Sequence, residues 1–456
     1  MSLLIPGTNS IKDTTYDVAN SLRFDGGSST YLDRAASGST SSNTTFTVSF
    51  WTKRAHLGDK QVVFMHENAT SHAHKFEINF RTDNKITIET YKDGYEYNVL
   101  SSAQFKDVSA WYHFVVRVDT TQSTESDRYR IYANGVQLTL TEAGNGYPTQ
   151  NFEFNLGTKI LAVGRYQAAS PSAYLDGHLT EVVYCDGQSL APTSFGEFDS
   201  DSPTIWKPID VSGLTFGNNG FYLDFEDSSN LGNDVSSNAS DFTANNLDAT
   251  HQSTDTCTNN FCTLNPLYPV NTFSYSEGNL KGTSSGSAKG IAKGTIGIRD
   301  SGKWYFEIKG YNSGTWGAGI AAEDSPINTW SLGSGTHAIY NYNGTKHVNA
   351  SSSSYGATFT GGDYIGVAYN ADDAEITFYK NGASQGTITG LTTGIFMFPT
   401  IGDTGTSTDP IFECNFGNPT FSISSGNADD NGYGNFEYAP PSGYYSICTK
   451  NLAEFG

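Results

Sequence analysis

The sequence predicts an all-β protein built from two β-sandwich domains of the jelly-roll kind. Its 456 residues include 27 Tyr, 28 Phe and 48 Gly, and only 16% of them are charged. Such a composition is typical of many short strands joined by tight turns. Apolar residues recur with the two-residue period of strands, and no segment repeats them at helical spacing over three turns. The length exceeds that of one ordinary core, so we expect more than one domain.

The first sandwich is predicted within residues 1–200, where short alternating runs recur from residue 22 onward. In "FTVSFWTKR", Phe46, Val48 and Phe50 alternate with the residues between them, as in a sandwich strand. In "RIYANGVQL", Asn134-Gly135 supplies the two residues that a type I′ turn needs at positive φ. The runs on either side of this pair are therefore predicted to be a hairpin.

The stretch "AWYHFVVRVD", residues 110–119, contains a histidine that invites a catalytic interpretation. Alternate residues of this run are all apolar: Tyr112, Phe114, Val116 and Val118. We expect that face in the core, with Trp111 and His113 on the less buried face. A catalytic histidine needs a nucleophile or carboxylate within hydrogen-bond reach, and no local spacing supplies one. We therefore interpret the stretch as a structural strand.

A polar segment, residues 201–270, follows the first sandwich and is rich in Asn, Asp and Ser. So polar a segment cannot bury enough apolar surface for a core of its own. We expect an ordered connector that lies along its neighbours. Its predicted anchors are Phe221, Leu223, Phe225, Phe242 and Leu247.

The second sandwich is predicted over residues 271–422 and is followed by a Gly- and Asn-rich tail, residues 423–456. In "GKWYFEIKG", Trp304, Phe306 and Ile308 alternate with their neighbours, so a strand would place all three on its inward face. The sequence "FYKNG" repeats the Asn-Gly turn signal of the first domain. The tail either packs back on a domain or docks elsewhere.

Charge and hydropathy exclude some classes of partner. The formal net charge is -21, from 47 acidic and 26 basic residues, which argues against a nucleic-acid partner. No run of about 18 apolar residues is present, so no membrane insertion is expected. The start, "MSLLIPGTNSIKD", lacks the features of a secretory signal, so we expect assembly in a cytoplasm. Five scattered cysteines predict free thiols. Cys257 and Cys262 are close enough in sequence to pair or to begin a metal site, but a second pair of ligands is missing.

Neither catalysis nor metal binding has a convincing motif. The run "MHENATSHAH" gathers His66, Glu67, His72 and His74, but without a further ligand we interpret it as a polar loop. Glycan-cleaving jelly rolls need two carboxylates on one strand face, and the Glu-x-Asp-x-x-Glu pattern that would carry them is missing. We assign no catalytic residue and expect no enzyme.

The first domain resembles the LamG or pentraxin branch of concanavalin A-like jelly rolls. The resemblance lies in the order of "FTVSFWTKR", "WYHFVVRVD", "RIYANG", "AVGR" and "YLDGHLTEVVYCDG". It implies a two-sheet sandwich whose rim loops, in relatives, bind carbohydrate or protein, often around calcium. Relatives commonly have an aspartate where this chain has Thr180, before Glu181. Calcium binding is therefore left open, and no metal ligand is assigned.

The second domain resembles a SPRY domain through "GKWYFEIK", "GAGIA", "GGDYIGVAYN" and "ITFYKNGASQG", in that order. The resemblance implies a bent sandwich that binds proteins through surface loops and has no catalytic centre. Segments that are loops or strand ends in SPRY relatives supply the surface candidates for ligand binding: Trp316, Trp330, Tyr340 and Tyr342. In the first domain, Tyr91 and Tyr95 in "YKDGYEYN" are candidates for sugar stacking, with hairpin packing as the alternative.

Nearly the whole chain resembles tail-fibre-like virion proteins of tailed bacteriophages. The resemblance rests on the order of the two modules, on "NNGFYLDFEDSSNLGNDVSSN" and "TDTCTNNFCTLNP", and on the closing "YYSICTKNL". It implies attachment to a host surface glycan or protein, other virion proteins as partners, and a homo-oligomer in the particle. The alternatives are a capsid-decorating or tail structural protein and, from another class, a glycan depolymerase.

Overall fold

The computed structural model describes residues 16–36, 38–67, 74–157, 159–166, 169–268, 273–285, 290–323, 325, 335–349, 351–403 and 409–456. The chain divides into two compact units with a boundary between Thr258 and Asn259. We call Thr14–Thr258 the N-terminal unit and Asn259–Gly456 the C-terminal unit. The segment expected as a connector therefore lies, up to residue 258, within the N-terminal unit.

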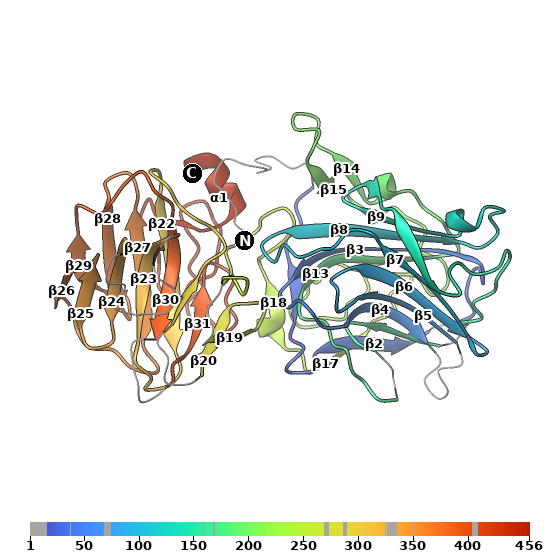
Figure 1. The fold of residues 1–456 in the computed structure, drawn as a ribbon, viewed down its shortest axis with the longest axis horizontal. Coiled ribbons are helices and arrows are strands. Elements are labelled where there is room, and N and C mark those ends of the chain that lie inside the picture. Colours follow the sequence, from blue (N-terminus) through green and yellow to red (C-terminus); the bar gives the residue numbers. More distant parts are fainter. Residues whose placement is uncertain are drawn as a thin grey trace. The chain divides into compact units, whose positions relative to one another are not determined.

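The N-terminal unit is a sandwich of two antiparallel sheets, which Figure 1 shows as two layers. The first sheet has the order β10 (Val136–Gln137), β9 (Tyr129–Ala133), β8 (Trp111–Asp119), β3 (Thr45–Arg54), β13 (Gly177–Asp186), β1 (Ser21–Phe24) and β18 (Gln252–Ser253), and β16 (Phe221–Leu223) pairs with β13. The second has the order β11 (Leu140–Gly144), β7 (Tyr95–Ser101), β6 (Ile86–Lys92), β5 (His74–Phe80), β4 (Gln61–Glu67), β12 (Ile160–Val163), β2 (Tyr31–Ala35) and β17 (Thr243–Asn245).

The core of this unit lies between the two sheets and includes the predicted face of β8. Phe114, Val116 and Val118 are fully buried there, and Tyr112 packs against the same core. Four of the predicted anchors of the polar segment are buried in it, and Leu247 packs against it. The turn residues Asn134 and Gly135 have φ of 47° and 78°, so the predicted type I′ hairpin between β9 and β10 is confirmed.

The expectation that Trp111 and His113 lie on a less buried face is wrong: they are 9% and 1% exposed. Residues 190–216 cover part of this outer face of the first sheet. Phe195, Val211 and Phe216 from that segment pack on the sheet. The segment contains the 3₁₀ turn η2 (Pro192–Ser194) and a small sheet, β14 (Gly196–Phe198) with β15 (Trp206–Pro208). Elsewhere in the unit are the 3₁₀ turns η1 (Glu125–Asp127) and η3 (Ala249–His251).

The C-terminal unit is a second antiparallel sandwich. Its first sheet has the order β19 (Phe273–Ser276), β20 (Lys281–Ser284), β31 (Ile411–Asn415), β22 (Lys303–Gly310), β27 (Tyr364–Asn370), β28 (Glu375–Lys380) and β29 (Ala383–Ile388). The second has the order β21 (Ile291–Lys293), β30 (Met397–Asp403), β23 (Trp316–Ala322), β24 (His337–Asn341), β25 (Thr345–Val348) and β26 (Ser351–Ser354). The predicted inward residues Trp304, Phe306 and Ile308 are fully buried between these sheets.

The tail packs back on the C-terminal unit. Its strand β32 (Tyr445–Ser446) pairs in parallel with β22, and Ile447 and Leu452 join the core. A short helix, α1 (Thr449–Phe455), follows, which helical periodicity over three turns could not reveal because it has only seven residues. No described helix is long and apolar enough to cross a membrane. All five cysteines are free, as predicted.

Candidate ligand-binding site

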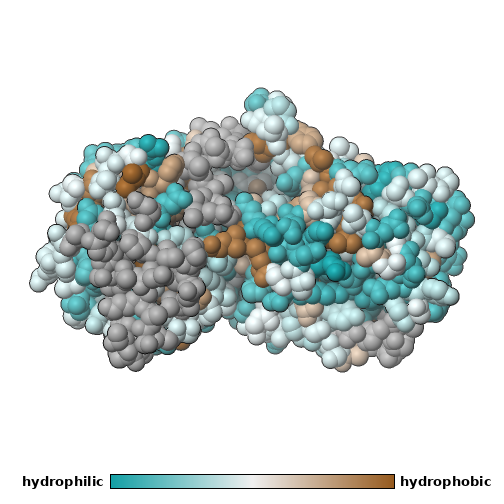
Figure 2. Space-filling model, viewed as in Figure 1, coloured by the Kyte–Doolittle hydropathy of each residue, from teal (hydrophilic) through white to brown (hydrophobic). Residues whose placement is uncertain are grey.

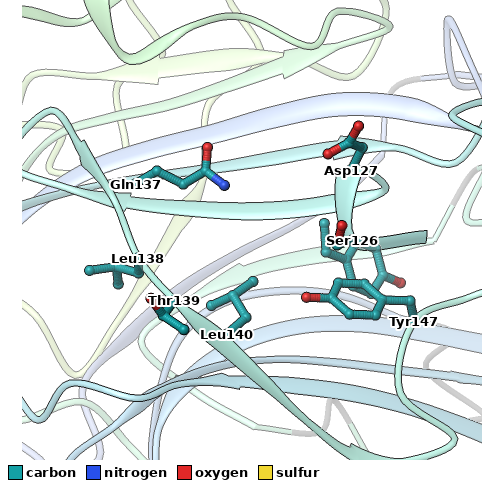
Figure 3. A pocket seen from close by; sticks show the side chains of 8 residues that line it. Ser126, Asp127, Gln137, Leu138, Thr139, Leu140 and Tyr147 are labelled. Carbon is teal, nitrogen blue, oxygen red and sulfur yellow. The ribbon is translucent and has the colours of Figure 1, made fainter. Parts of the chain in front are cut away.

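A cavity of about 290 Å³ opens at the rim of the N-terminal unit. Three separate segments line it: η1 with the start of β9, the strand β10 with the residues that lead into β11, and the loop after β11. The lining residues are Ser126, Asp127, Tyr129, Gln137, Leu138, Thr139, Leu140 and Tyr147. We call this the rim cavity (Figure 3). Its volume is close to the lower limit for small-molecule sites, about 300 Å³.

The hairpin at Asn134-Gly135 positions one side of the rim cavity. Because the turn closes in two residues, Gln137 pairs directly with Tyr132, and the chain then crosses to the second sheet, where Leu140 pairs with Ser101. Leu138 and Leu140 pack against the core and give the cavity an apolar side. In Figure 3, Leu140 lies beside the Tyr147 ring, while Gln137 and Asp127 lie on the other side of the opening.

The polar groups of the rim cavity combine a carboxylate, an amide and hydroxyls. The Asp127 carboxylate pairs with Arg130, with Oδ1 2.6 Å from Nη2. Tyr147 is half-buried, and its pKa is raised by burial and by the carboxylates of Glu142 and Glu125. Its hydroxyl is therefore a neutral donor and acceptor at pH 7. An aromatic ring beside hydrogen-bonding groups suits a ligand with an apolar face and many hydroxyls.

A smaller cavity of about 90 Å³ adjoins the rim cavity, because Asp127 lines both. Arg117, Asp119, Gln122, Arg130 and Ser189 line the rest of it. Arg117 is committed to the protein, since its guanidinium donates to the Ser189 hydroxyl at 3.3 Å and carbonyl at 3.1 Å. This space is well below the volume of a small-molecule site, so we regard it as an extension of the rim cavity.

The outer face of the first sheet carries an aromatic cluster around His113. The Trp206 indole N–H donates to His113 Nδ1 at 2.9 Å, and His113 Nε2 lies 2.8 Å from Ser49 Oγ. The rings of Trp51 and Trp206 stack on the imidazole, at 4.7 and 6.0 Å between centroids. Burial lowers the pKa of His113 to about 3, so the ring is neutral at pH 7. The imidazole is therefore buried and hydrogen-bonded within the fold, which agrees with the structural interpretation of this histidine.

Glu181 lies on β13 at a β-bulge and has a φ of 52°. Its carboxylate accepts from the hydroxyls of Tyr222 at 2.9 Å and Tyr16 at 3.0 Å. Burial raises the pKa of Glu181 to about 7, and the nearby Asp224 and Glu226 add to the rise. The described residues contain no group of three or more His, Cys, Asp or Glu side chains arranged to hold a metal.

The histidine-rich run forms no metal site among its described residues. His66 is buried on β4 without a hydrogen-bond partner for its ring, and Glu67 pairs with Arg165, with 3.3 Å between Oε1 and Nη1. His74 pairs with Asp93, with Nε2 3.0 Å from Oδ1. The remaining histidine of the run, His72, lies outside the described residues.

The expected surface aromatics of the second domain are mostly in its core. Trp316 and Tyr340 are fully buried, so the expectation that they lie at the surface is wrong. Both lie on interior strands of one sheet and pack against Phe359, at 4.7 and 5.0 Å between ring centroids. Tyr342 is half-buried against the same core. Trp330 lies outside the described residues.

Tyr91 and Tyr95 do not form one stacking platform. The hairpin between β6 and β7 pairs Tyr91 with Glu96 and Tyr95 with Lys92. Directly paired residues share a face and successive residues alternate, so the two tyrosines lie on opposite faces of the sheet. Tyr95 is 62% exposed, whereas Tyr91 is half-buried. The two rings face opposite ways because the chain reverses at Asp93-Gly94, between them.

No local pattern in the sequence marks the rim cavity. The hairpin turn was recognisable, but Ser126, Asp127 and Tyr147 come from turns of no distinctive pattern. The three segments meet only because β9, β10 and β11 bridge the two sheets at this rim. A combination of Asp, Gln and Tyr beside a predicted hairpin was the one available clue.

Two family models match the chain. Residues 25–188 match the concanavalin A-like lectin/glucanases superfamily, and residues 303–414 match the SPRY domain. No curated protein matches significantly.

Solved structures that are similar to parts of the chain share little sequence with it. A heptameric SAP-like pentraxin from Limulus polyphemus is 13% identical over 39% of this chain and 80% of its own, with a TM-score of 0.30. The SPRY domain of human HERC1 is 17% identical over 30% of this chain and 87% of its own, with a TM-score of 0.26. Domains LG4-5 of the mouse laminin alpha1 chain are 9% identical over 97% of this chain and 90% of their own, with a TM-score of 0.31. From the family models and the two sandwiches, the chain combines a LamG-type concanavalin A-like domain with a SPRY domain.

Proposed function

We propose that this chain is a non-catalytic binding protein of a tailed-bacteriophage particle, and that its rim cavity holds a carbohydrate of the host surface. The virion context is supported by the order of sequence motifs along nearly the whole chain. We expect other virion proteins as partners and several copies of the chain in one particle. Many copies would convert a weak site into firm attachment.

The rim cavity is the observation that carries the proposal. It places a half-buried tyrosine ring, two leucine side chains and a set of hydrogen-bonding groups around about 290 Å³. A sugar offers the same combination, because its ring has apolar C–H faces and a hydroxyl rim. The aromatic cluster at His113 does not compete as a site, because Trp206 and the segment around it cover it.

Binding is tested with a glycan array, on which the intact protein is compared with Gln137→Ala and Thr139→Val. Both residues are exposed, so these changes remove polar groups of the rim cavity without opening the core. We expect each variant to lose at least fivefold in affinity for the glycans that the intact protein retains. The matched control is Gln150→Ala, an exposed glutamine of the same unit outside the cavity. Equal retention by all four proteins contradicts the assignment of the rim cavity.

Position in the particle separates attachment from a structural role. Cryo-electron microscopy of intact particles locates the protein and counts its copies. Copies at the distal end of the tail apparatus, with the rim cavity facing outward, support attachment. Copies spread over the capsid, or wedged between tail proteins with the rim cavity covered, contradict it and favour a decorating or tail structural protein.

A further inference from the structure

A second cluster with ligand-binding chemistry lies in the C-terminal unit, on the outer face of its first sheet. Lys309 of β22 pairs directly with Tyr364 of β27 on one side and with Glu413 of β31 on the other. Its neighbour Ile308 is buried in the core, so alternation directs Lys309 to the outer face. Toward the other end of the strand the tail covers this face, where Phe436 packs on Tyr305 at 5.2 Å between ring centroids.

Three aromatic rings surround the Lys309 ammonium group. Its Nζ lies 4.7 Å from the ring centroid of Phe421, 5.1 Å from that of Tyr311 and 5.2 Å from that of Tyr364. Among the described residues, no carboxylate lies within 4.0 Å of it and no acceptor takes a hydrogen bond from it. This half-buried cation therefore has hydrogen-bonding capacity that no described acceptor of the protein uses and that an anion can take up.

Tyr311 provides a flat apolar surface beside this cation. The side chain is 43% exposed, and its hydroxyl donates to Glu413 Oε2 at 2.9 Å, which fixes the ring. Lys281 Nζ lies 5.5 Å from the same ring and 3.5 Å from Glu413 Oε1. Two lysines therefore lie beside the Tyr311 ring, where Glu413 and Glu277 are the nearby carboxylates.

We propose that Lys281, Lys309, Tyr311, Tyr364, Glu413 and Phe421 form a second binding site, which takes a carboxylate-bearing sugar. The sugar's carboxylate accepts hydrogen bonds from Lys309, and an apolar face of its ring packs on Tyr311. One sugar residue carries both the single negative charge and the flat face that this cluster matches.

The test uses frontal affinity chromatography on immobilised full-length protein, with tetragalacturonic acid as the probe. Its fully methyl-esterified form has the same rings without charge, and a tetraglutamate peptide has the same charge without sugar rings. We expect the acid to bind, the ester to bind at least tenfold more weakly, and the peptide to bind at least fivefold more weakly. We also expect binding of the acid to weaken as NaCl is raised from 50 to 300 mM, which needs no variant.

Two variants separate the cation from the ring. Lys309→Met keeps the aliphatic stem and should weaken binding of the acid at least tenfold, and Tyr311→Leu should weaken it at least threefold. The matched control is Lys303→Met, at the other end of the same strand, which should change binding less than twofold. Equal binding of acid and ester, or no effect of Lys309→Met, overturns the proposal. Equal binding of acid and peptide overturns the sugar class in favour of an acidic protein segment.

The proposals for this site and for the rim cavity can be tested independently. Gln137→Ala and Thr139→Val lie in the N-terminal unit and should leave tetragalacturonate binding unchanged. A loss of tetragalacturonate binding in those variants assigns the ligand to the rim cavity and overturns the second site.

Discussion

The indole N–H of Trp206 donates to Nδ1 of His113 across 2.9 Å, and this bond fixes the state of the histidine. Because an indole N–H is only a donor, Nδ1 must accept, and the ring proton of the neutral form lies on Nε2. Nε2 then donates to Ser49 Oγ, 2.8 Å away. Strand β15 is thereby fastened to the outer face of the first sheet. Both nitrogens serve the fold, so the histidine is not available as a base.

Stability should therefore depend on His113 at acidic pH. Burial lowers its pKa to about 3 from an ordinary value of 6.5. Below pH 6.5 the unfolded chain takes up a proton that the folded chain does not, so stability falls as pH falls toward 3. We expect this group alone to reduce the free energy of unfolding by about 2–3 kcal/mol between pH 7 and pH 4.5. Urea unfolding at the two pH values, followed by tryptophan fluorescence, measures the change.

The variant His113→Gln isolates the contribution of this one histidine. The decrease in its free energy of unfolding between pH 7 and pH 4.5 should be about 2–3 kcal/mol smaller than that of the intact protein. The exposed His56 provides the control, because His56→Gln should leave the fall as in the intact protein. If His113→Gln loses as much free energy of unfolding between these pH values as the intact protein, the result contradicts a neutral, buried imidazole.

Glu181 should give the opposite pH dependence. Burial raises its pKa to about 7, so the folded chain keeps a proton that the unfolded chain loses above pH 4.5. Stability from this group is thus lost as pH rises from 4.5 to 7. Between pH 4.5 and pH 7.5, we expect the free energy of unfolding of Glu181→Gln to rise by about 2–3 kcal/mol relative to that of the intact protein. Urea unfolding checks this, with the exposed Glu96→Gln as the control; parallel pH curves for Glu181→Gln and the intact protein would count against the assigned pKa.

Two glycines in equivalent turns should differ in their tolerance of alanine. Gly94 and Gly135 both take the second position of an Asx-Gly hairpin turn, at φ of 91° and 78°. A Cβ on Gly94 meets nothing within 4 Å, whereas one on Gly135 lies 2.4 Å from the Trp206 ring. Gly94→Ala should lower the free energy of unfolding by about 1–2 kcal/mol, because alanine is strained in a left-handed backbone conformation. Gly135→Ala should cost about 2 kcal/mol more, because Trp206 must move. Thermal unfolding compares them, and equal costs would mean that Trp206 does not pack on this turn.

The strand pattern of the sequence predicted the fold because alternation and turn chemistry are local. Asn134-Gly135 and the alternation of Phe46, Val48 and Phe50 need only neighbouring residues to be recognised. Burial by distant segments is not local. Alternation placed His113 correctly on the face away from the core, but nothing nearby in the sequence says that Trp206 covers that face.

The candidate site was predictable only in its class. Aromatic residues at SPRY strand ends were expected at the surface, yet Trp316 and Tyr340 serve as core anchors because their strands are interior in the sheet. The rim cavity depends on three segments that meet across the two sheets. The Lys309 cluster depends on a register between β22, β27 and β31 that spans about a hundred residues of sequence.

The central claim, that the rim cavity holds a carbohydrate, is tested most directly by a crystal structure of the protein with the best oligosaccharide from the glycan array. The account predicts sugar density between Tyr147 and Leu140 on one side and Asp127 and Gln137 on the other. Sugar density elsewhere on the protein, with the rim cavity holding only water, would contradict it.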